Sequence, residues 1–239
     1  QVAHVSKKNG VSTCQQLNDI VLARDLLDDL GARASDLLQS NYVIWVEGPS
    51  DRTYLNYWIG KWAKENSVRL VEGIHYSIML YGGKLLNALD ASSDCSNEKL
   101  IALFHINTHF CVLMDSDRKS KYARLCKTKT RIIDECKESG AMHWVTWGST
   151  IENYVPADVL TTAIETVHPG KSWNHNLDER FICPLSFKFE GTRSLSPNKI
   201  AIAKLVCETG FVPLGDCSRQ ISKLCHSICD ANGIRDKEG

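Results

Sequence analysis

The sequence lacks the features that mark membrane, secreted and zinc-binding proteins. No apolar stretch reaches membrane-spanning length, and no signal-peptide pattern is recognisable. None of the ten cysteines forms a Cys-x-x-Cys pair, and several lie in apolar stripes, which predicts buried thiols of a reducing compartment. We therefore expect a cytoplasmic protein without a membrane partner, a disulfide framework or a zinc-binding cysteine quartet.

The sequence also lacks an excess of charge of either sign and a nucleotide-binding loop. Lysine and arginine together number 28, as do aspartate and glutamate, so any electrostatic role requires local clusters of charge. The Walker A pattern Gly-x-x-x-x-Gly-Lys-[Ser/Thr] does not occur, and Gly82-Gly83-Lys84 alone does not replace it. We expect no nucleotide site in these 239 residues, which are enough for one sizeable core with a small appendage.

Four apolar segments predict the strands of a parallel sheet. The clearest are Val43–Val46 and Phe110–Met114, because neither alternates with polar residues and both therefore resemble strands buried on two faces. Residues 75–81 and 142–147 are further candidates. Helical patterns lie between these segments, and this alternation predicts an α/β fold with a Rossmann-like parallel sheet flanked by helices.

Apolar residues at helical spacing predict the helices that connect and follow these strands. Ser50 is the expected cap of the helix after the first strand. The helix after the third strand is expected to include Tyr122, Ile132 and Cys136, with Gly140 past its end. Other helices are expected over residues 17–30, 85–89, 157–167, from Ser196-Pro197 to Val206, and 216–230.

Three parts of the chain are expected. Residues 1–39, with a hairpin signal at Asn9-Gly10, form a lead-in, for which the end of a preceding domain is one interpretation. Residues 40–156 form the sheet-containing core. Residues 157–239 form a helical segment that packs on this core or caps it.

Five carboxylates lie just beyond the carboxyl ends of the predicted strands. They are Glu47, Asp51, Asp115, Asp117 and Glu152. Because parallel strands end at one edge of a sheet, where ligands bind in open α/β folds, we expect these acids to meet. Such a cluster repels itself unless cations occupy it, and oxygen ligands favour Mg²⁺, Mn²⁺ or Ca²⁺ over zinc. Five carboxylates suffice for the two ions that assist phosphodiester cleavage. The alternative is that each acid only caps a helix or lies in a solvated turn.

A run of basic residues follows the Asp115–Asp117 pair without an intervening acid. Its members are Arg118, Lys119, Lys121, Arg124, Lys127, Lys129 and Arg131. A DNA backbone held by these residues would lead into the carboxylates. No pattern here indicates base reading, so we expect weak sequence preference. The alternative is a solvated helix face.

Four short segments resemble the Toprim domain of topoisomerases, primases and some nucleases. They are residues 45–52, 81–86, 113–117 and 151–154, with the sequences WVEGPSDR, YGGKLL, LMDSD and IENY. The resemblance is closer to the C-terminal Toprim nuclease of the OLD (overcoming lysogenization defect) family and extends from about Leu30 to the C-terminus. It implies a metal-dependent DNA nuclease joined to an upstream ABC-type ATPase, used in phage defence and able to form a homodimer.

The resemblance also implies roles for individual residues. All five carboxylates match acidic ligands of Mg²⁺ or Mn²⁺, two ions are expected, and Glu47 is an alternative general base. Lys199, within Asn198-Lys199-Ile200-Ala201, matches the lysine of the family, although a solvated lysine is the alternative. Ser116 is a candidate further ligand, with a simple turn serine as the alternative.

Other functions stay open. The second candidate is a non-cleaving metal- and DNA-binding Toprim module that serves as a scaffold for a partner. A topoisomerase or primase is disfavoured, because the chain has no convincing nucleophilic-tyrosine domain and no zinc-binding cysteine quartet. RNA in place of DNA also stays open.

Overall fold

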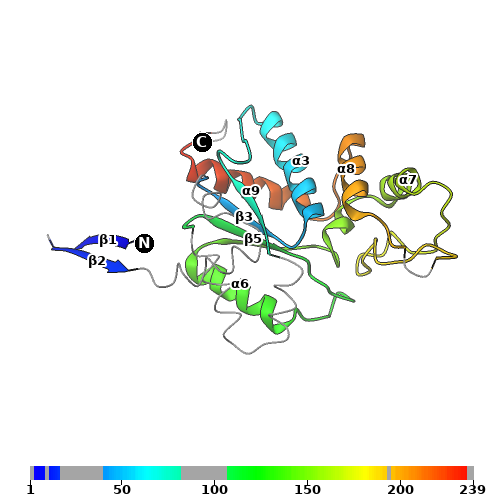
Figure 1. The fold of residues 1–239 in the computed structure, drawn as a ribbon, viewed down its shortest axis with the longest axis horizontal. Helices are drawn as coiled ribbons and strands as arrows, with labels where there is room; N and C mark the ends of the chain where they lie inside the picture. The colour runs from blue at the N-terminus through cyan, green and yellow to red at the C-terminus, as the bar shows by residue number, and fades with distance from the viewer. Residues whose placement is uncertain (1–2, 9–10, 17–39, 82–106, 193–194, 236–239) are drawn as a thin grey trace.

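The fold is described from a computed structural model, which describes residues 3–8, 11–16, 40–81, 107–192 and 195–235 (Figure 1). Strands β1 (Ala3–Lys8) and β2 (Val11–Gln16) form an antiparallel hairpin, which confirms the hairpin predicted there. The helices predicted over residues 17–30 and 85–89 lie outside the described residues.

A four-stranded parallel sheet forms the centre of the fold, in the order β4-β3-β5-β6. Its strands are β3 (Val43–Val46), β4 (Ser77–Leu80), β5 (Phe110–Met114) and β6 (Met142–Val145). Every residue of β3 and β5 is buried, as their uninterrupted apolar sequences predicted, and these strands occupy the middle of the sheet. The predicted α/β fold with a parallel sheet is confirmed.

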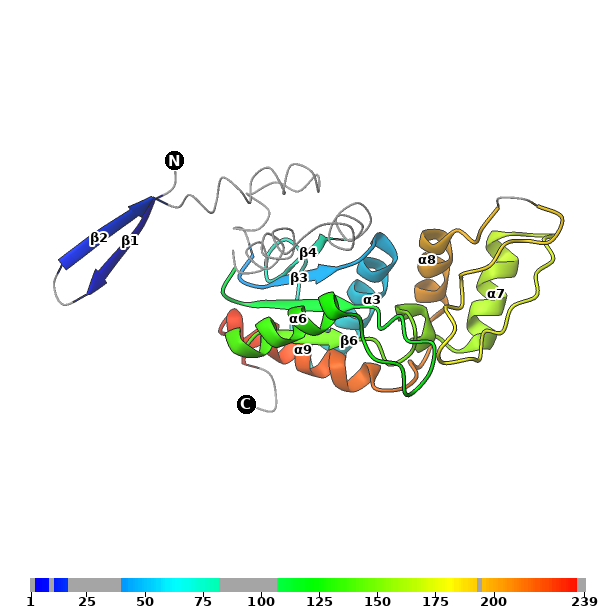
Figure 2. The same cartoon turned by 90° about the horizontal axis from the view of Figure 1, so that it is seen from below.

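Helices cover both faces of the sheet. Helices α3 (Pro49–Glu65) and α9 (Cys217–Ala231) lie on one face and α6 (Lys127–Ser139) on the other (Figures 1 and 2). Side chains of β3 alternate accordingly, since Ile44 and Val46 belong to the main hydrophobic core with α3 and α9 whereas Trp45 does not. The sheet is therefore a layer between two layers of helix.

The C-terminal helices extend the same core. Helix α8 (Lys199–Thr209) packs against α3 and against α7 (Ala157–Val167). Side chains of α8 and α9, among them Val206 and Leu224, are buried in the main core together with β3. The bounds of α7 are those predicted, and residues 173–192 lack regular structure, as expected.

The start of α3 differs from the prediction. Gly48, not Ser50, is the N-cap, and Pro49 is the first helical residue. Proline suits this position because the N–H that it lacks would have no partner inside the helix. The Asp51 carboxylate accepts a hydrogen bond from the Gly48 N–H at 2.8 Å, so Asp51 stabilises the turn in place of a serine hydroxyl. Helix α8 likewise begins later than predicted, with Asn198 as its cap through a hydrogen bond from the Ala201 N–H.

The start of α6 was also predicted wrongly. The helix begins at Lys127, and Tyr122, which was expected on its buried face, is 90% exposed. A helix over residues 118–126 would align Arg118, Lys121 and Arg124 three residues apart, and like charges at this spacing destabilise a helix. The end was predicted correctly, because Gly140 adopts the left-handed conformation just past it.

Two further observations concern the described residues as a whole. In the part that the structure describes, no helix combines the length and apolar character of a membrane span. No disulfide joins the cysteines of that part, and Cys111, Cys136, Cys217 and Cys225 are buried, as their apolar surroundings predicted.

Candidate functional site

The carboxyl ends of β3 and β5 lie side by side at the centre of the sheet. From there the chain leaves β3 into α3 on one face, and it continues from β5 toward α6 on the other (Figure 1). This divergence opens the crevice in which open α/β sheets bind ligands. Glu47 directly follows β3 and Asp115 directly follows β5, so both carboxylates are placed at this crevice.

A cavity of about 480 Å³ occupies the crevice. Four of the five predicted carboxylates line it, together with the predicted lysine: Glu47, Asp51, Asp115, Glu152 and Lys199. Asp51 comes from the first turn of α3, Glu152 from the short 3₁₀ helix η1 (Ile151–Tyr154) after β6, and Lys199 from the first turn of α8. The fold thus joins residues that are far apart in the sequence.

Hydrogen bonds hold each of these carboxylates in place. Glu47 accepts a bond from the Asp115 N–H at 3.1 Å, and Asp115 accepts one from the Ile151 N–H at 2.9 Å. Glu152, whose side chain is 2% exposed, accepts a bond from the Thr150 hydroxyl at 2.6 Å. The acids are therefore fixed by backbone and hydroxyl donors of neighbouring strand ends.

Burial and mutual repulsion raise the pKa values of three of the acids. Burial, followed by the charges of Glu152 and Glu47, raises the pKa of Asp51 to about 7. Burial and then Asp51 and Glu47 raise the pKa of Asp115 well above its ordinary value. Burial also raises the pKa of Glu47, against the opposing charge of Lys129. Ionisation of these carboxyl groups in the cavity is therefore unfavourable, and a bound cation would offset its free-energy cost.

The donor set suits a hard divalent cation, because every acidic group in the cavity offers carboxylate oxygens. Within the described ranges, however, no group of three or more His, Cys, Asp or Glu side chains is arranged to hold a metal ion. The carboxylates of the cavity would therefore have to draw together around an ion. Burial, followed by the charges of neighbouring acids, raises the pKa of Asp51 and Asp115, and a bound cation would offset both effects.

Lys199 lies with the acids. Its ammonium nitrogen is 3.8 Å from Glu152 Oε1, and 45% of the side chain remains exposed toward a potential ligand. Burial acts to lower the pKa of Lys199, but the surrounding negative charges, with Glu152 the largest among them, together outweigh it, so the pKa is raised overall. The lysine is therefore cationic and accessible from the cavity.

Asp117 is the predicted acid that does not line the cavity. Strand β5 ends at Met114, so Asp115 and Asp117 do not share a strand face. Asp117 adopts a left-handed conformation with φ of 50°, and its side chain is 68% exposed. The Asp117 carboxylate instead binds the Lys129 ammonium.

Lys129 is a member of the cluster that the sequence did not reveal. Its ammonium binds the Asp117 carboxylate, the Asp115 carbonyl oxygen at 2.6 Å and Glu47 Oε1 at 3.4 Å. The sequence placed it only in a basic run. The overlooked signal was its spacing from Ile132 and Cys136, three and seven residues later, which puts Lys129 on the buried face of α6.

Ser116 lies in the turn after β5, buried among backbone groups. Its hydroxyl donates to the Gly148 carbonyl oxygen at 2.5 Å and accepts a bond from the Arg118 N–H at 3.2 Å. These contacts correspond to the turn serine that was the alternative to a metal ligand. Ser116 thereby ties the end of β5 to the segment that leads into η1.

The chain was compared with known proteins. No family model, curated protein or solved structure matched it. The resemblance to Toprim nucleases therefore stays a prediction from four short segments, and the acidic cavity is the main support for a function.

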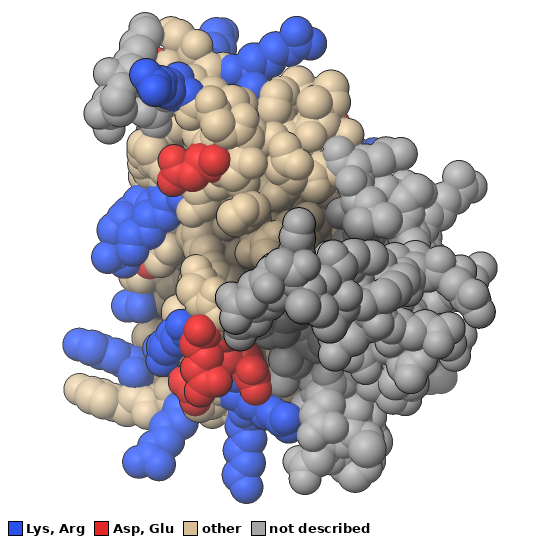
Figure 3. Space-filling view, turned by 90° about the vertical axis from the view of Figure 1, so that its left-hand side faces the viewer, with Lys and Arg blue, Asp and Glu red and all other residues tan. Residues whose placement is uncertain are grey.

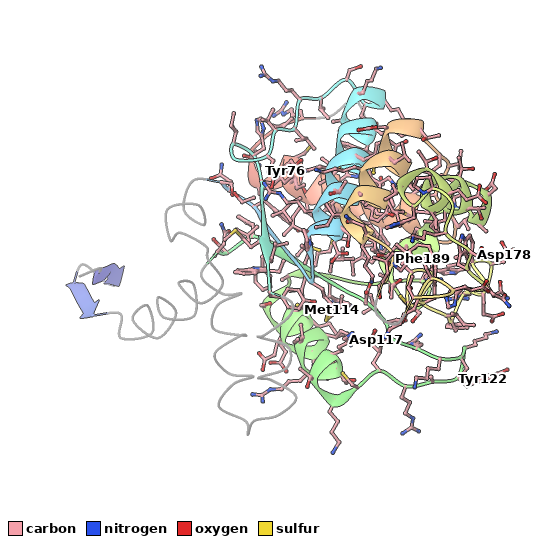
Figure 4. The ribbon with its side chains drawn as sticks, turned by 45° about the vertical axis from the view of Figure 1, so that its right-hand side comes forward. Tyr76, Met114, Asp117, Tyr122, Asp178 and Phe189 are labelled. Carbon is pink, nitrogen blue, oxygen red and sulfur yellow. The ribbon has the colours of Figure 1, made fainter. Side chains whose placement is uncertain are left out.

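The predicted DNA-binding residues lie on the segment that leaves β5. Lys119, Lys121, Arg124 and Lys127 are exposed, whereas Arg118 is half-buried. Figure 4 shows Met114, Asp117 and Tyr122 following one another along this segment, with Tyr122 at its outer end. The segment thus carries exposed positive charge directly beside the acidic cluster.

Proposed function

We propose that the chain is a divalent-metal-dependent nuclease of the Toprim type that hydrolyses phosphodiester bonds in DNA. The observation that carries the proposal is the meeting of four carboxylates and a lysine in one cavity, although five different elements supply them. As the OLD-family resemblance implies, the nuclease would act with an upstream ABC-type ATPase in phage defence.

Glu47, Asp51, Asp115 and Glu152 are the residues that would hold Mg²⁺ or Mn²⁺. When bound, such an ion lowers the pKa of water and stabilises the charge that develops on a phosphodiester during hydrolysis. Because these four side chains offer only oxygen ligands, the site suits Mg²⁺ or Mn²⁺ better than zinc.

The other roles belong to side chains of the chain itself. Lys199 is positioned to bind the phosphodiester and to offset the negative charge of the transition state, because it is cationic and partly exposed. Glu47 is the alternative general base, since its raised pKa brings the carboxylate closer to the basicity that proton abstraction near neutral pH requires.

Nicking of supercoiled plasmid in Mg²⁺ or Mn²⁺ tests the proposal. Asp115→Asn keeps the size of the side chain but removes its charge, and we expect it to lower the nicking rate by at least about a hundredfold. The matched control is Asp134→Asn, an exposed acid on α6 that pairs with Lys137 outside the cavity, which should nick at the wild-type rate. Equal nicking by wild type and Asp115→Asn, or none by either, would contradict the proposal.

A specific observation favours the second candidate, a metal- and DNA-binding module that does not cut. The acids of the described chain are not arranged as a ready ligand group, so an ion has to reorganise them. Plasmid binding that depends on divalent ions, without nicking in any of them, would support this scaffold function over the nuclease.

A further inference from the structure

Lys129 is a buried cation in a position where a divalent ion would be expected. Its side chain is 8% exposed, and its ammonium contacts two carboxylates of the acidic cluster, those of Glu47 and Asp117. A lysine is rarely buried unless it is paired. Lys129 satisfies this condition twice, so it is an internal component of the cluster and not part of the surface charge of α6.

All the hydrogen-bonding capacity of this ammonium is directed into the cluster. A lysine has three N–H donors, and three acceptors surround Lys129: the Asp115 carbonyl oxygen, Asp117 Oδ2 and Glu47 Oε1. An ion placed between Glu47 and Asp117 would have to displace it. Displacement would leave a buried positive charge without partners, which is strongly unfavourable.

The two sides of the cluster therefore differ. The cavity, with Asp51, Asp115 and Glu152, is lined by acids and has space for a ligand, whereas Asp117 does not line it. Asp117 has Lys129 as its cationic partner instead. Among the described residues of the cluster, the acids of the cavity side therefore face an open space, whereas Asp117 faces the Lys129 ammonium.

We propose that the Lys129 ammonium takes the place of a second metal ion, so that the site binds one divalent ion in the cavity. This inference rests on the proposed function and revises the expectation of two ions. Asp117 then serves to hold Lys129, which makes it a positioning residue and not a metal ligand. The acids then have three positive partners: the ion supplied by solution, Lys129 from α6 and Lys199 from α8.

Counting bound Mn²⁺ tests the inference without any measurement of cleavage. Free Mn²⁺ is quantified by electron paramagnetic resonance while the protein is titrated with the ion. We expect one tightly bound ion per chain for the wild type and for Lys129→Arg, which keeps the charge, and two for Lys129→Met, which removes it. Lys127→Met removes a charge from an exposed position of the same helix and should bind one ion.

Each outcome decides between the claims. Two ions on the wild type would overturn the inference and leave the proposed function intact, and this count requires no variant to fold. One ion on both the wild type and a folded Lys129→Met would also overturn the inference, because removal of the lysine would not have created a second ion site. Absence of Mn²⁺ binding by the wild type would overturn the proposed function and, with it, the inference.

Discussion

Gly148 shows how closely one residue controls the position of the acidic site. It lies between β6 and η1, and its carbonyl oxygen accepts hydrogen bonds from the hydroxyls of Ser116 and Thr146. A Cβ atom at this position would be 2.3 Å from Asn153 Cβ and 2.7 Å from the Arg180 carbonyl oxygen. The lack of a side chain therefore allows η1, which carries Glu152, to approach the end of β5.

Gly148→Ala should consequently destabilise the protein. Because neither the Asn153 Cβ nor the backbone carbonyl can move away easily, we expect a loss of about 2 kcal/mol in the free energy of unfolding. Gly60→Ala is the control, since Gly60 lies inside α3 with no heavy atom within 4 Å of the added Cβ, and it should gain about 1 kcal/mol. Urea unfolding followed by circular dichroism measures both changes. Equal stability of the two variants would contradict the crowding inferred at Gly148.

At the scale of elements, a hydrogen-bond network attaches η1 to β6 and α9. The Tyr154 hydroxyl accepts bonds from the indole N–H of Trp144 and the N–H of Trp147, both at 2.9 Å. It donates to Asp216 Oδ1 at 3.0 Å, and the other oxygen of Asp216 accepts a bond from Gln220. This network holds the element that supplies Glu152.

The network predicts a particular dependence of stability on pH. Burial acts to raise the pKa of Asp216, but the hydrogen bonds from Gln220, Tyr154 and Arg219 and the positive charge of Arg219 together outweigh it, so the pKa is lowered overall. A carboxyl whose pKa is lowered in the folded state stabilises the protein at pH values above the pKa of the unfolded state. This stabilisation is lost as the pH falls through the pKa of the folded state. Asp216→Asn should therefore cost about 1 kcal/mol at neutral pH.

The free energies of unfolding of the wild type and Asp216→Asn should differ by a constant amount from neutral pH to about pH 5. This difference should narrow below about pH 4, where the carboxyl becomes protonated in the unfolded chain. Chemical unfolding at a series of pH values measures it. Asp178→Asn removes an exposed acid from an irregular segment, away from any helix end, and its free energy of unfolding should show no comparable dependence on pH. A difference that widens toward acid pH would contradict the lowered pKa.

The elements also show why only part of the molecule follows from its sequence. The bounds of β5 were predicted because five consecutive apolar residues are all buried, so local composition and tertiary environment agree. The start of α6 was missed because apolar spacing around Tyr122 imitates a helix, while repulsion between basic residues opposes one.

The position of the acids of the candidate site could be predicted from the sequence, whereas the side chains that pair with these acids could not. The acids follow strand ends, and parallel topology brings strand ends together whatever the details of packing. The contact between Lys129 and Asp117 depends on where α6 begins and on the left-handed backbone of Asp117, neither of which is evident from the sequence.

At the scale of the whole molecule, neutral composition conceals an uneven distribution of charge. Helices α3 and α6 begin near the acidic cavity and end at the opposite end of the sheet (Figure 1). The opposite end, which faces the viewer in Figure 3, carries acidic side chains among its lysines and arginines. The exposed Lys119, Lys121 and Arg124, by contrast, have no acid between them in the sequence.

Removal of these three charges should weaken DNA binding and reduce its dependence on salt. Each phosphate that the protein no longer neutralises lowers the slope of log K against log salt concentration by about 0.9, so replacement of Lys119, Lys121 and Arg124 by alanine should lower the slope by about 2 to 3. Fluorescence anisotropy with a labelled duplex, at several salt concentrations and without divalent ions, measures this slope in the absence of cleavage. The matched control replaces three exposed basic residues: Lys64 and Lys137, in the last turns of α3 and α6, and Arg69, in the segment that follows α3. An equal change of slope in both triple variants would mean that DNA binds through overall charge, with no preference for the segment beside the cavity.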